Sequence, residues 1–281
     1  MAHNYQSPDV QEVADVVGDS LGLRREAVNV KADIIVFCGV HFQAETIKLS
    51  SPKKKVLLPD KNARCPMADM IRPDDLKALQ ARHPEAVTLC YVNSSAETKA
   101  LCDYCCTSDN VLNIARDMMT RHKEIIFVPD KHLAQYVSAQ VRHHFITWEG
   151  CCPVHDKISL ENIVELKNKH PRARVIVHPE CKPSVTAVAD VVTSTEGMSR
   201  HVSTSGHREF IIGTETSIIH RLKKENPDKI FYMASEKAIC EDMKKITPEK
   251  ILHSLENLSY EITLSPEIME KARRCIEEMP Y

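Results

Sequence analysis

The sequence lacks an excess of charge of either sign. Lys and Arg together number 37 and Asp and Glu number 39, which gives a formal net charge of −2 over 281 residues. A protein whose main partner is nucleic acid or an anionic membrane surface usually carries a basic excess. The charge balance therefore argues against both kinds of partner.

Long hydrophobic runs are also missing. The longest uninterrupted apolar run is a handful of residues, whereas a transmembrane helix needs about 20. The sequence also shows no charged segment followed by an apolar one, the pattern of a secretory leader. We therefore expect a cytoplasmic protein that does not bind a membrane.

The paired CxxC motifs of zinc ribbons are absent, although the chain has 11 cysteines. Cys102 and Cys105 form one CxxC, but it lies in an apolar segment and has no second pair. A chain of this length and composition does not resemble a secreted disulfide scaffold, so we expect most of the cysteines to be buried thiols. A soft-metal site would have to draw its ligands from distant parts of the chain.

What the sequence does contain is a repeat. The phrase ADVVGDS begins at Ala14, a near copy ADVVTST begins at Ala189, and the related segment CDYCCTSD begins at Cys102. The turn residues Ser20, Ser108 and Thr195 follow one another at intervals of 88 and 87 residues. The chain is therefore interpreted as three units of about 87 residues.

Further polar residues recur in the same register. The first set is His3, Tyr91 and His178; the second, two residues later, is Tyr5, Asn93 and Glu180; the third is Cys65, Cys152 and Cys240. Each of these sets repeats at intervals of 87 or 88 residues. A position that keeps its polar character through three units is a candidate for a shared site.

The pattern within each unit predicts the fold. Runs rich in Val and Ile alternate with amphipathic helical segments, which is typical of a parallel sheet covered on both faces. We expect an α/β protein made of three αβα sandwich units, related by a pseudo-threefold axis and arranged around a central active site. The expected units span 1–72, 73–158 and 159–281, the last with additional C-terminal helices. Because loops after parallel strands lie at one sheet edge, the repeated polar residues should meet near the axis.

The three repeated cysteines lie in polar, turn-like loops, NARCP, GCCPVH and AICED. This setting favours metal binding over core packing. Three converging thiolates suit either a [4Fe–4S] cluster with one iron not bound by protein or a zinc ion with an open fourth position. An open position implies Lewis-acid chemistry.

The other candidates are hydroxyl and titratable side chains. Ser20, Ser108 and Thr195 precede helical sequence, where a hydroxyl commonly caps the helix and the helix N-terminus attracts anions. Glu180 and His178 are the candidate general acid and base. We interpret His41, His132 and His220, near the starts of amphipathic helices, as structural.

These residues also carry a family likeness. The segments AHNYQ, GDSLGL, YVN, CCTS, HPEC and HRLKKENPDK resemble those of quinolinate synthases, and the likeness runs from residue 2 to the end. The resemblance implies a threefold αβα architecture around a [4Fe–4S] cluster held by Cys65, Cys152 and Cys240. It also implies condensation of iminoaspartate with dihydroxyacetone phosphate to quinolinate, a precursor of NAD, with loss of phosphate and two waters. An L-aspartate oxidase or dehydrogenase would then supply the iminoaspartate.

The resemblance also assigns the other site residues. Substrate-binding positions are His3, Ser20, Tyr91, Asn93, Ser108, His178, Glu180 and Thr195, and the catalytic candidates are Glu180, His178 and Tyr5, which is similar to the family's active-site tyrosine. The turn TSTEGM around Thr195 departs from the family's more usual GSTSQM.

Two other functions stay open at this point. One is a zinc-dependent lyase or hydrolase that uses the same three cysteines, and the other is a non-catalytic threefold scaffold that binds a ligand.

The start of the chain raises a further expectation. The second and third units open with a helix and a strand before Tyr91 and His178, but only Met1 and Ala2 precede His3. We therefore expect a truncated or mis-started chain that is less stable and poorly active.

Overall fold

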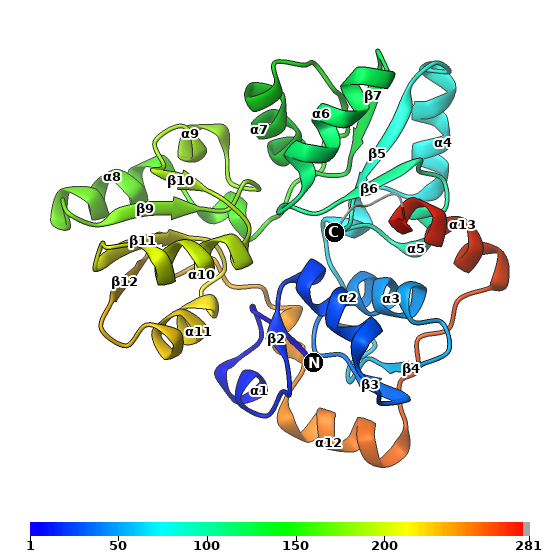
Figure 1. Ribbon diagram of the computed structural model, residues 1–281, viewed down its shortest axis with the longest axis horizontal. Helices are drawn as coiled ribbons and strands as arrows, with labels where there is room; N and C mark the ends of the chain where they lie inside the picture. The colour runs from blue at the N-terminus through cyan, green and yellow to red at the C-terminus, as the bar shows by residue number, and fades with distance from the viewer. Residues whose placement is uncertain (278–281) are drawn as a thin grey trace.

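The computed structural model describes residues 1–277 and arranges them as three lobes around a centre (Figure 1). Each lobe contains four parallel strands with helices on both faces, so the predicted α/β fold of three αβα units is confirmed. The strands are β1 (Ala2–His3), β2 (Val17–Gly18), β3 (Ile34–Val36), β4 (Lys55–Leu57), β5 (Val87–Tyr91), β6 (Tyr104–Cys106), β7 (Ile125–Val128), β8 (Ile146–Thr147), β9 (Arg174–Val177), β10 (Val191–Val192), β11 (Glu209–Gly213) and β12 (Ile230–Met233).

The strand order is the same in each unit. The second sheet runs β6-β5-β7-β8 and the third β10-β9-β11-β12. In the first unit β1 pairs with β2, β3 pairs with β4, and a parallel bridge between Ala2 and Cys38 joins the two pairs. The central strands are rich in β-branched residues, and Ile125–Val128 is fully buried, as expected for a parallel sheet with both faces covered.

The helices alternate with these strands. They are α1 (Pro8–Glu12), α2 (Ser20–Asn29), α3 (His41–Ser50), α4 (Pro73–Arg82), α5 (Ala96–Lys99), α6 (Val111–Arg121), α7 (Lys131–Val141), α8 (Leu160–Lys169), α9 (Pro183–Thr186), α10 (Thr195–Thr204), α11 (Ile218–Glu225), α12 (Pro248–Asn257) and α13 (Pro266–Glu277). Three single-turn 3₁₀ helices follow the repeated cysteines: η1 (Ala68–Met70), η2 (His155–Lys157) and η3 (Met243–Lys245).

The caps of the repeated helices differ from the expectation. Asp19 and Ser194 are the N-caps of α2 and α10, and their side-chain oxygens accept hydrogen bonds from Gly22 N (2.7 Å) and Gly197 N (3.0 Å). The prediction that Ser20 and Thr195 cap these helices is therefore wrong by one residue. The N-cap of α6 is Asn110, two residues after Ser108. The three hydroxyls are thus not consumed in capping.

The two C-terminal helices, which follow the third unit, pack against the first and second units. Helix α12 begins 88 residues after α8, which itself begins 87 residues after α4, but α12 packs beside β3 of the first unit, where Ile251 joins the core. The chain then runs antiparallel along β4, with Ile262 N donating to Val56 O (2.8 Å). Helix α13 lies beside α5 and buries Cys275 in the core of the second unit (Figure 1). The expected unit boundaries at 72/73 and 158/159 stay a prediction.

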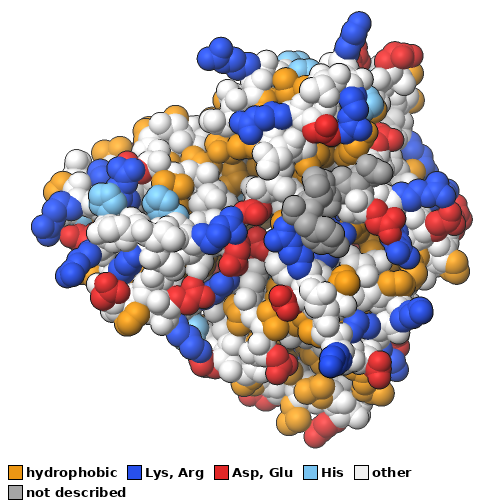
Figure 2. Space-filling view, in the orientation of Figure 1, with side chains coloured by type: hydrophobic (Ala, Val, Ile, Leu, Met, Phe, Trp, Pro, Cys, Tyr) orange, Lys and Arg blue, Asp and Glu red, His pale blue; other side chains and the backbone are white. Residues whose placement is uncertain are grey.

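The surface agrees with the balanced composition. Figure 2 shows basic and acidic side chains interspersed over the visible face, without a large area of one sign. Within residues 1–277, no helix combines the length and apolarity needed to cross a membrane.

Candidate active site

A pocket lies where the three units meet. Its walls come from the ends of β1, β5 and β9, the first turns of α2 and α10, and the loops before the 3₁₀ turns. The pocket brings together all twelve side chains named from the sequence: His3, Tyr5, Ser20, Cys65, Tyr91, Asn93, Ser108, Cys152, His178, Glu180, Thr195 and Cys240. Their convergence follows from the parallel topology, which sends the loops after equivalent strands to one edge.

The three cysteines have the same local structure. Each precedes a 3₁₀ turn, and its carbonyl accepts a hydrogen bond from the backbone N–H four residues on: Asp69 to Cys65 (3.1 Å), Asp156 to Cys152 (3.0 Å) and Lys244 to Cys240 (3.3 Å). Burial raises the pKa of each thiol. The backbone N–H groups of Ala68, His155 and Met243 act in the opposite direction and lower the thiol pKa. Each turn therefore presents one thiol together with an N–H group that favours its thiolate form.

A buried acid–base group also lines the pocket, next to Cys152. Glu180, which follows β9, has Oε2 2.7 Å from His155 Nδ1 and 3.7 Å from His178 Nδ1, and its Oε1 accepts from Asn93 Nδ2 at 3.3 Å. Burial alone would raise the pKa of Glu180, but the adjacent His155 and His178 lower it to about 2. The carboxylate is thus held in its ionised form.

A chain of two side-chain hydroxyls, those of Thr214 and Tyr5, extends from His155. Its Nε2 lies 2.8 Å from Thr214 Oγ1, which is 2.5 Å from the Tyr5 hydroxyl. Burial raises the pKa of the Tyr5 phenol, and the charge of Glu180 adds to the effect. The phenol therefore keeps its proton. Through Thr214 and His155, this proton is connected to the Glu180 carboxylate.

His3 and His178 are buried on neighbouring walls. Burial lowers the pKa of each imidazole to about 3, so both are neutral near pH 7. His178 Nε2 lies 3.2 Å from Ser108 Oγ, and the His178 ring stacks on His155 at 4.7 Å between centroids. A neutral imidazole can either donate or accept one proton, so both rings are suited to polar contact with a ligand.

The other two repeated hydroxyls are each held by an amide. Gln43 Nε2 donates to Ser20 Oγ and Asn4 Nδ2 donates to Thr195 Oγ1, both at 3.0 Å. Each amide occupies an acceptor position of its hydroxyl, which leaves the hydroxyl proton available. Both hydroxyls lie in the first turn of ten-residue helices, where the helix dipole favours an anion.

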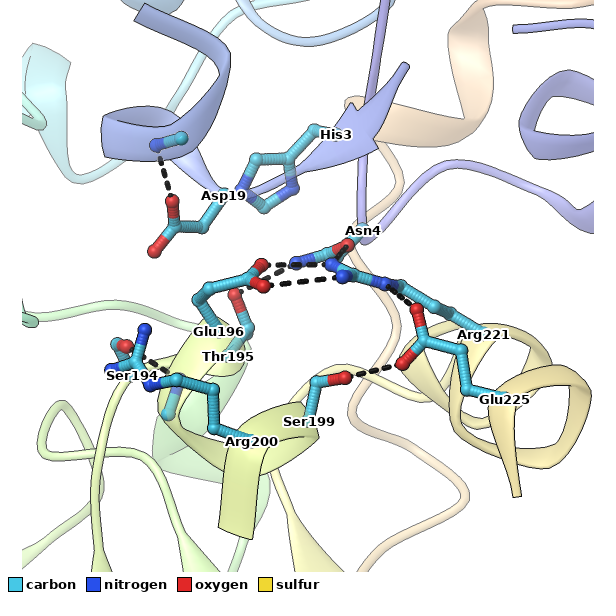
Figure 3. A network of polar contacts seen from close by, with 12 residues as sticks. His3, Asn4, Asp19, Ser194, Thr195, Glu196, Ser199, Arg200, Arg221 and Glu225 are labelled. Atoms are coloured by element: carbon cyan, nitrogen blue, oxygen red, sulfur yellow. Dashed lines mark hydrogen bonds and ion pairs between the residues drawn. The ribbon is translucent and has the colours of Figure 1, made fainter. Parts of the chain in front are cut away.

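The turn TSTEGM, which differs from the family's usual GSTSQM, is held in place by an ion pair with α11 (Figure 3). Glu196, next to Thr195, pairs with Arg221 of α11 through Oε2 at 2.8 Å and Oε1 at 3.2 Å. Arg221 Nη1 also donates to Asn4 Oδ1 (3.0 Å), which fixes the amide that holds Thr195. Arg221 therefore connects the first turn of α10 with the segment after β1.

Known proteins resemble this chain over almost its whole length. The model of the family described as quinolinate synthetase A protein matches residues 1–280. The chain belongs to the quinolinate synthase family. It is 47% identical over 279 residues to quinolinate synthase 1 of Methanosarcina acetivorans, and the aligned region covers 99% of this chain and 91% of that relative. It is 48% identical over 280 residues to the quinolinate synthase of Thermodesulfovibrio yellowstonii, with 99% and 92% covered. The chain is thus an enzyme of this family.

Some residues of the quinolinate synthase pocket were missed by the sequence reasoning. Asp19, Gln43 and His155 line the pocket, and Thr214 contacts two of its side chains. The repeat spacing does not reveal His155, because the equivalent residues in the other units are Ala68 and Met243. The available signal was its place three residues after Cys152 in the segment CPVH.

Proposed function

We propose that this chain condenses iminoaspartate with dihydroxyacetone phosphate to form quinolinate, releasing phosphate and two waters. The observation that carries the proposal is the convergence of the twelve residues, thiols and acid–base groups together, in one pocket. Membership of the quinolinate synthase family supports it. The expected supplier of iminoaspartate is an enzyme that oxidises L-aspartate.

We propose that Cys65, Cys152 and Cys240 hold a [4Fe–4S] cluster. The donor set fits: three thiols in equivalent turns face one pocket, each with an N–H group that favours its thiolate. A single zinc ion would draw three sulfurs to within about 3.8 Å of each other. In the part of the chain that the structure describes, the three thiols are not among the groups whose ligand atoms all lie within 4.8 Å. This wider spacing favours a multinuclear cluster. When bound, the cluster supplies a Lewis-acidic iron for a hydroxyl or carboxylate of the substrate.

The protein's own side chains then hold the substrates and move protons. The hydroxyls of Ser20, Ser108 and Thr195 would donate to carboxylate or phosphate oxygens near the ends of α2 and α10. Glu180 Oε2 would accept a proton, and the Tyr5 hydroxyl and His178 would donate or return one during condensation and dehydration. His3, Tyr91 and Asn93 would complete the substrate contacts from the ends of β1 and β5.

Anaerobic purification tests the proposal directly. The protein should contain iron and sulfide in equal amounts and form quinolinate from the two substrates. A protein that carries iron and sulfide but forms no quinolinate would overturn the reaction. A protein without iron or sulfide that still forms quinolinate would overturn the cluster.

One observation favours a second candidate, a zinc-dependent lyase or hydrolase. Cys152, His155 and Glu180 offer ligand atoms that all lie within 4.8 Å of one another, a spacing suited to one zinc ion. Zinc in the purified protein, dependent on His155, with no iron or sulfide, would support this candidate. The other alternative, a non-catalytic scaffold that binds a ligand, would show substrate binding without turnover.

A further inference from the structure

A second group of metal-ligand side chains lies outside the active-site pocket. His132 belongs to the first turn of α7, and Cys151 and Asp156 lie on either side of Cys152. One nitrogen, one sulfur and one oxygen from these residues all lie within 4.8 Å of one another. None of the three lines the active-site pocket.

The His132 ring is held with one nitrogen aimed at the group. Its side chain is about nine-tenths buried, at 10% exposure. Nδ1 lies 3.5 Å from Gln135 Oε1, so it can carry the ring proton, and this leaves the lone pair on Nε2. Nε2 is buried without a hydrogen-bond partner among the described residues and lies 3.6 Å from Asp156 Oδ1. A buried ring nitrogen without a partner is costly unless it binds something.

The charges around the group leave room for a cation. Lys182 Nζ lies 3.3 Å from Asp156 Oδ1 and also donates to the Asp156 backbone carbonyl at 2.6 Å. Lys131, next to His132, pairs with Glu149 at 3.2 Å. A cation bound by Asp156 would compete with Lys182 only for the carboxylate, because the carbonyl contact can keep the Lys182 ammonium in place. Lys182 is 37% exposed and can shift toward solvent.

We propose that His132, Cys151 and Asp156 bind one divalent metal ion of the Zn²⁺ class. One imidazole nitrogen, one thiolate and one carboxylate are zinc ligands, and tetrahedral zinc spaces such atoms about 3.3–3.8 Å apart. The His132–Asp156 separation of 3.6 Å falls in this range. A water molecule would take the fourth position. His132, interpreted as structural from the sequence, is then a ligand.

The position of this site gives it a function. Cys151 and Asp156 enclose the segment that carries Cys152 and His155, both of which face the active-site pocket. A metal bound to both residues and to His132 would tie the two ends of this segment to α7. The ion would therefore stabilise the loop without contacting the substrate. This inference does not depend on the proposed reaction.

The test is a titration of ZnCl₂ into the anaerobically purified protein with its native metal content. We expect one zinc per chain by calorimetry and by metal analysis after gel filtration, with iron and sulfide unchanged. His132→Asn, Cys151→Ser and Asp156→Asn should each weaken zinc binding roughly tenfold or more. They should also abolish the rise in melting temperature that zinc gives the parent. Circular dichroism shows whether each variant is folded. Cys151→Ser is nearly isosteric, so it keeps the test valid if another variant does not fold.

His41→Asn is the matched control. His41 begins α3, the helix of the first unit that corresponds to α7, and lies 3.5 Å from Glu45. Among residues 1–277 it belongs to no cluster of metal-ligand side chains that contains a thiol. The control should bind zinc like the parent. Equal affinity in the parent and all three ligand variants would overturn the proposal. Zinc uptake accompanied by loss of iron would also overturn it, because that zinc would be entering at the cluster thiols.

Discussion

Nδ1 of His155 lies 2.7 Å from Oε2 of Glu180, with both side chains buried. The two residues come from different units: His155 from the 3₁₀ turn after Cys152, and Glu180 from the loop after β9. The contact therefore connects the loop of Cys152 to the acid–base residue Glu180. It also positions Glu180 so that its other oxygen accepts from Asn93 of the second unit.

Replacing His155 tests this contact. His155→Asn should keep the fold and the iron content but lower quinolinate turnover, because the buried Glu180 charge loses its closest partner. A hydrogen bond to a charged group is worth about 1.5–3 kcal/mol, which corresponds to roughly ten- to hundredfold in rate. The measurement is kcat together with iron analysis. Loss of zinc in this variant, with zinc and no iron or sulfide in the parent, would instead support the zinc candidate.

Glu180→Gln should have a larger effect. The amide keeps the shape of the side chain and a donor–acceptor pair for Asn93, but it cannot accept a proton from the substrate. General acid–base catalysis contributes about 10²–10⁴-fold, so kcat should fall within that range while iron and sulfide stay at parent levels. Activity within about a factor of two of the parent would remove Glu180 from the proposed proton transfers.

The cysteines divide into two groups. Single replacement of Cys65, Cys152 or Cys240 with Ala should abolish cluster binding, because each removes one of the three proposed iron ligands. Replacement of Cys102, Cys105, Cys151 or Cys275 should leave iron and sulfide unchanged. Cys105 and Cys275 lie in the core of the second unit, and Cys151 faces His132 rather than the pocket. An iron-loaded Cys152→Ala protein beside an iron-free Cys151→Ala protein would show that the adjacent cysteine is the ligand.

The site could be predicted from the sequence where the three units share a residue type. His3, Tyr91 and His178 end or follow equivalent strands, so their spacing alone places them together. His155, Gln43 and Thr214 have no such counterparts. His155 and Thr214 act through contacts between units and Gln43 through a contact with Ser20 in its own unit, and the repeat spacing reveals neither kind of contact.

The fold was predictable to the same extent. Alternating β and helical patterns determine the parallel units, because each pattern reports which face is buried. The apolar faces of α12 and α13 show that each helix packs against something, but not on which unit. The placement of α12 beside β3 and of α13 beside α5 therefore needed the structure.

Asp19 should make stability depend on pH. Burial raises the pKa of its carboxyl to about 6, and the charges of Glu196 and Asp109 add to this, against the N–H of Gly22. The pKa in the unfolded chain is about 3.9. As pH rises from about 4 to about 6, the unfolded chain loses its proton first, so the free energy of unfolding decreases by up to about 3 kcal/mol.

Asp19→Asn should not show this decrease. Asn is also a good N-cap, so α2 keeps its cap. The difference in melting temperature between the variant and the parent should grow in favour of the variant from about pH 4 to about pH 6 and stay constant at higher pH. Asp9→Asn, at an exposed carboxylate in α1, is the control and should follow the parent. Parallel curves for Asp19→Asn and the parent would contradict the expected linkage.

Arg221 should determine how well Thr195 binds its ligand (Figure 3). It pairs with Glu196 through two nitrogens and donates to Asn4, whose amide holds the Thr195 hydroxyl. Lys keeps the positive charge but cannot reproduce the planar fork of donors. Arg221→Lys should therefore leave Asn4 poorly oriented, and KM for the substrate that Thr195 binds should rise more than kcat falls.

Arg200→Lys provides the matched comparison, because it makes the same change at an exposed arginine of α10. Arg200 pairs with Asp109 at 2.8 Å and is 60% exposed, so its replacement should leave KM and kcat close to the parent. Asn4→Ala should reproduce the KM effect of Arg221→Lys, and the double variant should add little to either, since both act through one hydroxyl. Full additivity of the two effects would show that Arg221 acts on the site by another route than Asn4.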